Sequence, residues 1–178
     1  MKISFINQDR GHYIDTQIKR SNSKFFYCKV SINHVIKWRN YLYRLLRKNI
    51  ISKVILNGPI ICLGTRNGRE IDLFRVAFFS NIVLVKFVKI FEITKYGWIS
   101  LLPSIEKLGK SNFKHIKNRS VFGVEINPKG SRNDVLTCSF DQLPEDLENT
   151  FSIIYSNSFD QSLDPYKTAK EWIRIAKN

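Results

Sequence analysis

Three short apolar segments in the last third of the chain constrain its fold most. They cover residues 121–126, 134–140 and 151–156, and each has the length of a single strand. The turn Asn127-Pro128-Lys129-Gly130 separates the first two segments, and Pro144 follows the second. Apolar segments of this length between turn residues are typical of strands within a sheet.

Helical patterns lie beside these segments. Asp164-Pro165 opens a helix that holds the proline in its first turn. Earlier in the chain, an apolar run at 60–63 leads into a glycine-containing turn at 64–68 and then into a helical segment at 69–75. Because strands that alternate with helices favour a parallel arrangement, we predict an α/β fold with a mostly parallel sheet flanked by helices.

The first 57 residues have a different character. Residues 1–29 are polar with scattered aromatic residues and show no clear period. Between residues 31 and 48, apolar residues recur at spacings of three and four, which predicts an amphipathic helix with Ser31 as its N-cap. Asn57-Gly58-Pro59 ends this helix-forming region. We expect residues 1–57 to form a basic N-terminal extension.

Length and composition indicate one domain of ordinary size. The chain has 178 residues, of which 43% are hydrophobic, and this is enough to bury a core. No apolar run approaches the roughly 20 residues that span a bilayer, and the N-terminus lacks the apolar stretch of a signal peptide. Cys28, Cys62 and Cys138 lie too far apart for a disulfide framework or a zinc pattern. We therefore expect a cytoplasmic protein without a metal site.

The net charge of +14 is unevenly distributed. Residues 1–60 carry +10 and residues 61–120 carry +7, whereas residues 121–178 carry −3. A basic front two-thirds favours an anionic partner, such as nucleic acid, a phosphorylated substrate or a membrane surface. A Lys-rich composition that serves only solubility gives the same numbers, so both interpretations stay open.

The glycine turn and one carboxylate are the candidate ligand-binding features. Gly64 and Gly68 allow the backbone to approach a ligand closely, because glycine has no Cβ. Glu125 ends the strand predicted at 121–126, where a carboxylate can accept both hydroxyls of a ribose. The two features are 61 residues apart, whereas a simple dinucleotide unit separates them by about 20. We interpret residues 78–119 as the insertion that accounts for the difference.

Four segments, in order along the chain, resemble the motifs of class I S-adenosylmethionine-dependent methyltransferases. A fifth segment, Glu171-Trp172-Ile173-Arg174-Ile175-Ala176-Lys177, is similar to the helix that follows these motifs in the family. The resemblance covers roughly residues 58–77 and 120–178. The four segments are Ile61-Cys62-Leu63-Gly64-Thr65-Arg66-Asn67-Gly68-Arg69-Glu70, Val121-Phe122-Gly123-Val124-Glu125-Ile126-Asn127-Pro128, Cys138-Ser139-Phe140-Asp141-Gln142-Leu143-Pro144 and Phe151-Ser152-Ile153-Ile154-Tyr155-Ser156-Asn157-Ser158.

The resemblance implies a Rossmann-like domain over residues 58–178, with the insertion at about 78–119, and S-adenosylmethionine as the cofactor. In such a domain Glu125 would hold the ribose and Asn157 would lie beside the transferred methyl group. Asp160 follows the fourth segment, where it is either the group that contacts the acceptor and takes its proton or a solvated loop acid. The cofactor-binding residues implied by the resemblance are Gly64, Thr65, Arg66, Gly68, Glu125, Ile126, Phe140 and Asp141, and the catalytic candidates are Asn157 and Asp160.

Two positions depart from the family pattern. The third motif normally has an acid where this chain has Ser139, and the fourth has Asp where this chain has Ser152. Asp141 would replace the first lost acid only through a local shift of the chain. Each lost charge-assisted hydrogen bond weakens binding by roughly 1.5–3 kcal/mol.

Three functional hypotheses follow. The first is a methyltransferase that acts on a small or carbohydrate-like acceptor, with the front region as a lid. The second is a catalytically inactive, basic relative that binds an anionic partner. The third places the helix at 31–48 on an anionic membrane. Methyl transfer itself needs no metal or triad, because the sulfonium is a strong leaving group and positioning is the main requirement.

Overall fold

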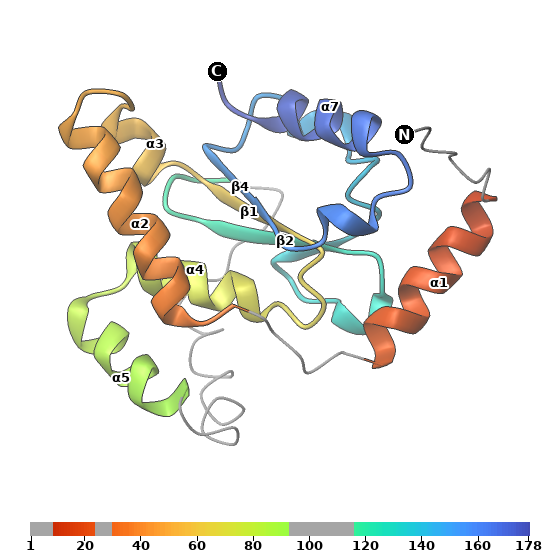
Figure 1. The fold of residues 1–178 in the computed structure, drawn as a ribbon, viewed down its shortest axis with the longest axis horizontal. Coiled ribbons are helices and arrows are strands. Elements are labelled where there is room, and N and C mark those ends of the chain that lie inside the picture. Colours follow the sequence, from red (N-terminus) through yellow and green to blue (C-terminus); the bar gives the residue numbers. More distant parts are fainter. Residues whose placement is uncertain (1–8, 24–29, 93–115) are drawn as a thin grey trace, which may run out of the picture.

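A four-stranded sheet forms the centre of the molecule. The computed structural model describes residues 9–23, 30–92 and 116–178. All neighbouring strands are parallel, in the order β3-β2-β1-β4 (Figure 1). This confirms the predicted parallel α/β sheet, and the arrangement is compatible with a Rossmann-like fold. The strands are β1 (Ile60–Leu63), β2 (Val121–Glu125), β3 (Val135–Thr137) and β4 (Ile153–Ser156).

Helices surround this sheet, and three of the six described helices begin where the sequence predicts. The helix predicted at 31–48 is α2, and Ser31 caps it by accepting a hydrogen bond from the His34 N–H. Asp164 caps the last helix through the N–H groups of Tyr166 and Lys167. The helices are α1 (Arg10–Ser23), α2 (Ile32–Arg47), α3 (Lys53–Asn57), α4 (Arg69–Phe79), α5 (Ile82–Glu92) and α7 (Pro165–Ile175), with short 3-10 turns at η2 (Pro128–Gly130), η3 (Glu145–Leu147) and η4 (Phe159–Gln161).

The two faces of the sheet carry separate apolar cores. Ile60 and Cys62 point to the face covered by α2, α4 and α5, whereas Ile61 and Leu63 point to the face covered by α7 (Figure 1). All four residues of β1 are fully buried, as expected for the central strand of a sheet covered on both sides. Strand β4 is only half-buried along its length.

Helix α2 belongs to the core of the sheet. Ile32 and Val35 are completely buried in the same cluster as Ile60. Residues 31–57, which we expected to form part of an extension, therefore share the core of the residues that follow them. Of the predicted insertion at 78–119, α5 packs near α2 and α4, and residues 93–115 lie outside the described part of the chain.

A buried network of charges connects α4 to β3. Asp72 is completely buried and accepts hydrogen bonds from Arg132 Nη2 at 2.9 Å and Nη1 at 3.0 Å. Arg75 Nη2 donates to Asp134 Oδ2 at 2.8 Å, and Arg132 Nε donates to Asp134 Oδ1 at 2.9 Å. Although burial lowers the pKa of Arg132, its bonds to Asp72 and Asp134 raise it above the usual range. Two cations and two anions thus compensate one another inside the fold.

The strand order creates a crevice at one end of the sheet. From β1 the chain proceeds to β2 and β3 on one side, and β4 lies on the other side of β1. The direction of the connections therefore reverses between β1 and β4, and in open α/β sheets ligands bind outside the carboxyl ends of the strands at such a point. Among the helices of the described residues, none has the length and apolarity to cross a membrane.

Candidate functional site

The turn after β1 brings the ends of three strands together. Gly64 has a φ of +76°, and a Cβ there would lie 2.9 Å from Ser158 Oγ, beyond the end of β4. The N–H groups of Gly64 and Thr65 both donate to the carbonyl of Val124 in β2, at 2.8 and 3.1 Å. Only glycine satisfies both the left-handed backbone and the close approach to Ser158. Gly64 therefore lets the turn after β1 pack against the residues after β4 at the base of the crevice.

Glu125 lies beside this turn, as its place at the end of the adjacent strand β2 requires. Its side chain is 3% exposed, and Oε2 accepts the backbone N–H of Arg66 at 2.7 Å. Arg66 has a φ of +53°, an uncommon conformation for a residue with a side chain. Oε1 accepts the N–H of Asn127 and the hydroxyl of Ser21, both at 3.0 Å. The carboxylate thus joins the turn, β2 and helix α1.

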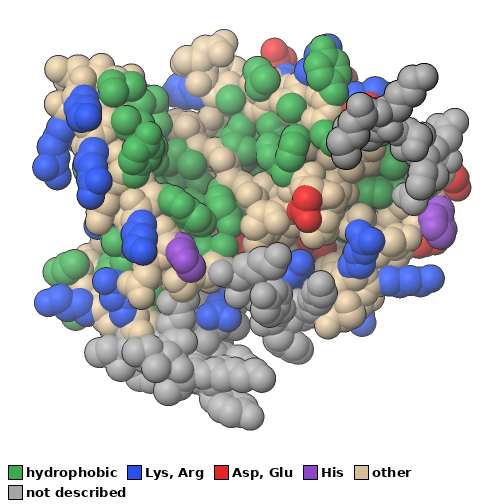
Figure 2. Space-filling model, viewed as in Figure 1, with side chains coloured by type: hydrophobic (Ala, Val, Ile, Leu, Met, Phe, Trp, Pro, Cys, Tyr) green, Lys and Arg blue, Asp and Glu red, His purple; other side chains and the backbone are tan. Residues whose placement is uncertain are grey.

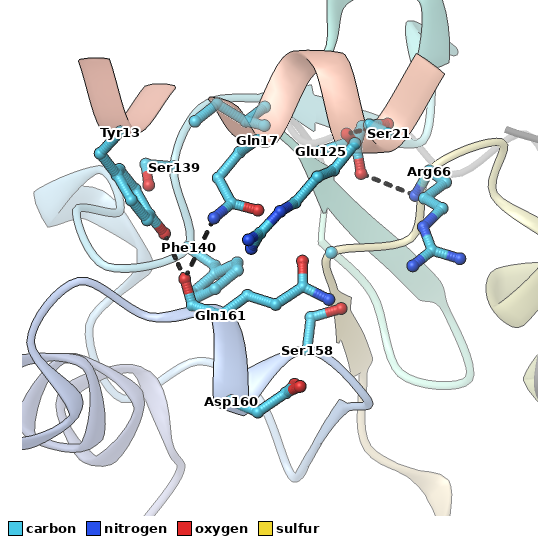
Figure 3. A pocket seen from close by; sticks show the side chains of 13 residues that line it. Tyr13, Gln17, Ser21, Arg66, Glu125, Ser139, Phe140, Ser158, Asp160 and Gln161 are labelled. Atoms are coloured by element: carbon cyan, nitrogen blue, oxygen red, sulfur yellow. Dashed lines mark hydrogen bonds between the residues drawn. The ribbon is translucent and has the colours of Figure 1, made fainter. Parts of the chain in front are cut away.

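A cavity of about 370 Å³ occupies the crevice, and its size falls within the usual range for small-molecule sites. Strand-end residues form one wall and α1 forms the other (Figure 3). Of the residues that the sequence singled out, six line it: Gly64, Arg66, Glu125, Ile126, Phe140 and Asp160. The other lining residues are Tyr13, Gln17, Arg20, Ser21, Ser139, Ser158 and Gln161.

Helix α1 covers the cavity with a polar stripe. Tyr13, Gln17 and Ser21 follow one another at intervals of four and are its buried residues. Tyr13 donates its hydroxyl to the carbonyl of Gln161 at 2.9 Å, and Gln17 Nε2 donates to the same carbonyl at 3.5 Å (Figure 3). Near its other end, Ser21 bonds Glu125. The helix therefore spans the cavity from the loop after β4 to the end of β2.

Because Tyr13 is buried, we expect its contribution to the stability of α1 over the cavity to depend on pH. Burial, with Asp141 nearby, raises the pKa of Tyr13 from 10.0 to about 12. Because the folded pKa is raised, the contribution of the neutral phenol to stability is complete below pH 10 and is lost as the pH rises through 12. We expect phenolate absorbance to show one tyrosine with an apparent pKa near 12 that is missing in Tyr13→Phe. Identical titrations of the two proteins would contradict this placement.

Four predicted site residues lie elsewhere. The side chain of Asp141 forms an ion pair with Arg10 of α1 at 3.7 Å, and Asn157 Nδ2 donates to Glu70 Oε1 at 3.2 Å. Thr65 is buried beneath the turn, and Gly68 begins α4 with a φ of +77° against the side chain of Arg132. None of the four lines the cavity. Of the two residues, Ser139 lines the cavity and Asp141 does not.

Trp172 of helix α7 holds Phe140 in position. Its ring meets Trp172 edge to face at 5.9 Å, and Trp172 Nε1 donates to the Phe140 carbonyl at 3.0 Å. Trp172 also contacts Phe159, one residue before Asp160. The aromatic contacts of α7 thus support two separate segments of the cavity wall.

A second, more open cavity of about 820 Å³ lies next to the first and shares Ile126 and Ser139 with it. Arg10 and Ile14 of α1 line the second cavity, whereas Tyr13 and Gln17 line the first. Helix α1 therefore separates two parts of one crevice and lines both of them with different side chains.

Sequence reasoning missed the contribution of α1. Its buried residues are polar, so a search for apolar periodicity does not find the helix. The signal present in the sequence is the spacing of four between Tyr13, Gln17 and Ser21, three residues able to form hydrogen bonds. No protein-family model matches this chain, and no significant match was found among curated proteins or among solved structures.

Proposed function

We propose that the chain binds S-adenosylmethionine in the crevice and transfers its methyl group to a small acceptor. The observation that carries this proposal is the position of Glu125, which faces the Gly64 turn across the carboxyl ends of β2 and β1. A carboxylate at this point of a parallel sheet suits the two hydroxyls of a ribose. The four motif resemblances support the choice of S-adenosylmethionine over other nucleosides.

The acceptor groups at the site fit such a ligand. An ionised carboxylate has about four lone-pair sites, and the backbone N–H groups of Arg66 and Asn127 use two of those on Glu125. The other two sites suit a ribose diol once the Ser21 hydroxyl, which occupies one of them, is displaced.

The remaining roles follow from charge and exposure. S-adenosylmethionine supplies an activated methyl group on a sulfonium. Arg20 and Arg66 offer guanidinium groups at the cavity for a carboxylate or an anionic acceptor. Asp160 is exposed, lines the cavity and can take the proton that the acceptor loses. Asn157 does not line the cavity but donates a hydrogen bond to Glu70. Its role would therefore be indirect, as a positioning residue that holds the Glu70 side chain.

A ligand panel tests the proposed class of ligand. We expect S-adenosylhomocysteine at saturating concentration to raise the melting temperature by several degrees, because a ligand at 100 times its dissociation constant stabilises by about 2.7 kcal/mol. NAD and ADP, which share the ribose but lack the amino-acid group, should give a smaller shift. An equal shift with all three would indicate a general nucleoside site, and the absence of any shift would contradict the proposal.

The inactive relative remains a second candidate, and one observation favours it. Ser139 lines the cavity where the family has an acid, while Asp141 is directed to Arg10. A module that retained the fold and lost the cofactor would give no shift in the panel.

The contact between Ser21 and Glu125 yields a further prediction. A ribose diol needs both lone-pair sites that the backbone leaves open, and the Ser21 hydroxyl takes one of them. We expect Ser21→Ala to bind S-adenosylhomocysteine roughly tenfold more tightly, since a competing bond to a charged group is removed. Calorimetry measures the change. Ser23→Ala is the matched control, because Ser23 is exposed on the same helix and its hydroxyl donates to the Arg20 carbonyl, not to Glu125. Weaker binding by Ser21→Ala would mean that Ser21 contacts the ligand instead.

A further inference from the structure

The outer surface of α2 and α3 combines positive charge with exposed apolar side chains. Lys37, Tyr41, Arg44 and Lys48 recur at intervals of four, three and four, and all are exposed. This spacing places them on one side of α2. Ile32 and Val35 of the same helix lie in the core. The charged stripe therefore faces away from the sheet.

The corner between the two helices adds apolar side chains to this stripe. Ile50 is 63% exposed and Val54 is 58% exposed, with the exposed residues Arg47 and Lys53 close to them in the chain. We call the set of Lys37, Tyr41, Arg44, Arg47, Lys48, Ile50, Lys53 and Val54 the α2–α3 face. Figure 2 shows Lys and Arg side chains gathered beside hydrophobic ones at the edge of the molecule that α2 and α3 form.

Acidic residues are scarce in the described segment that contains α2, α3 and α5. Residues 30–92 contain eleven Lys and Arg residues and three acids, Glu70, Asp72 and Glu92, of which Glu92 is the last residue of α5. Glu70 and Asp72 are buried, at 4% and 0% exposure. No carboxylate at the surface of residues 30–91 thus neutralises the α2–α3 face, and the surface is complementary to a negatively charged partner.

The exposed aliphatic residues distinguish between the possible anionic partners. Single-stranded nucleic acids are bound by aromatic stacking and basic grooves, so Tyr41 suits such a partner, but the tips of Ile50 and Val54 would have little to contact. The boundary between lipid headgroups and acyl chains accommodates aliphatic side chains, and anionic headgroups attract the basic residues next to them. Ile82 and Val83 of the neighbouring helix α5 are also exposed, at 63% and 71%, beside Lys86.

We infer that the α2–α3 face binds the surface of an anionic membrane, with Ile50 and Val54 entering the headgroup boundary and the basic side chains contacting lipid phosphates. This inference stands apart from the proposed methyl transfer, because none of these residues lines the crevice. The partner is the lipid surface itself, and the chain would be peripheral to it.

Vesicle sedimentation of the full chain tests this inference. We expect binding to phosphatidylcholine vesicles that contain about one-third phosphatidylglycerol, and much weaker binding to phosphatidylcholine alone. Arg44→Gln/Arg47→Gln/Lys48→Gln should weaken binding about a hundredfold, roughly fivefold for each charge removed. Ile50→Ser/Val54→Ser should weaken it about tenfold without a change of charge.

A matched control separates the α2–α3 face from net charge. Lys167→Gln/Lys170→Gln/Lys177→Gln removes three charges from exposed residues in and just after α7, the helix on the opposite side of the sheet. It should bind anionic vesicles almost as well as the parent. The inference is overturned if both triple variants lose binding equally, if neither lipid mixture binds, or if a labelled single-stranded RNA binds this face while vesicles do not. Unfolding curves of each variant exclude loss of the fold as the cause.

Discussion

Replacing Asp72 by alanine should destabilise the fold by about 3–5 kcal/mol, the cost of leaving a buried charge without its partner. Asp72 is completely buried and neutralises Arg132 through two hydrogen bonds. Its loss leaves two guanidinium groups, of Arg75 and Arg132, to share Asp134. Urea unfolding measures the effect as a lower midpoint, and Asp146→Ala, which changes an exposed acid in η3, should have little effect.

A double variant tests the explanation. Asp72→Leu/Arg132→Met removes one cation and one anion together and keeps the 2.8 Å pair of Arg75 and Asp134. We expect it to recover most of the stability that Asp72→Ala loses, since a balanced buried network is often replaceable by apolar side chains. If the double variant is less stable than Asp72→Ala, the loss arises from packing and not from an uncompensated charge.

Replacing Glu125 by alanine should weaken the binding of S-adenosylhomocysteine about a hundredfold, roughly 2–3 kcal/mol for hydrogen bonds to a charged group. Calorimetry at a temperature where the variant is folded measures the change. Asp146→Ala serves as the control, because Asp146 is an exposed acid of η3 that lines neither part of the crevice. Binding by Glu125→Ala as tight as that of the parent would remove the main physical support for the methyltransferase assignment.

The same variant should also lose stability, which differs from what the sequence suggests. An acid at the end of a strand is expected to contribute little to folding. In the structure, however, Glu125 is buried and accepts the N–H groups of Arg66 and Asn127. Its removal leaves two donors without their partner, and we expect a cost of about 1–3 kcal/mol for each one that stays buried.

The sheet was predictable because its signals are local. Each strand is a short apolar run followed within a few residues by Gly, Pro or Asn, and the alternation of strands with helices favours a parallel sheet. The position of Glu125 beside Gly64 follows from two adjacent parallel strands, although 61 residues separate them in the chain. The predicted N-cap Ser31 and the helix start predicted at Asp164-Pro165 depend on residues within the first turn of each helix and are also present.

The other features depend on contacts between distant residues that have no local signature. Helix α1 buries polar side chains against the loops that follow β2 and β4, so its sequence has no apolar stripe. The network of Asp72 and Arg132 joins residues 60 positions apart. Asp141 and Asn157 lie in segments that resemble the family motifs, but they contact Arg10 and Glu70, and neither residue lines the cavity.

The central claim is that S-adenosylmethionine binds at the carboxyl ends of β1 and β2. A titration of the ¹⁵N-labelled parent chain with S-adenosylhomocysteine, followed through backbone amide resonances, tests it most directly. We predict saturable shifts for Gly64, Arg66 and Asn127, whose N–H groups meet the strand end and the Glu125 carboxylate. Shifts confined to α2 and α3, or no shifts at all, would contradict binding in the crevice.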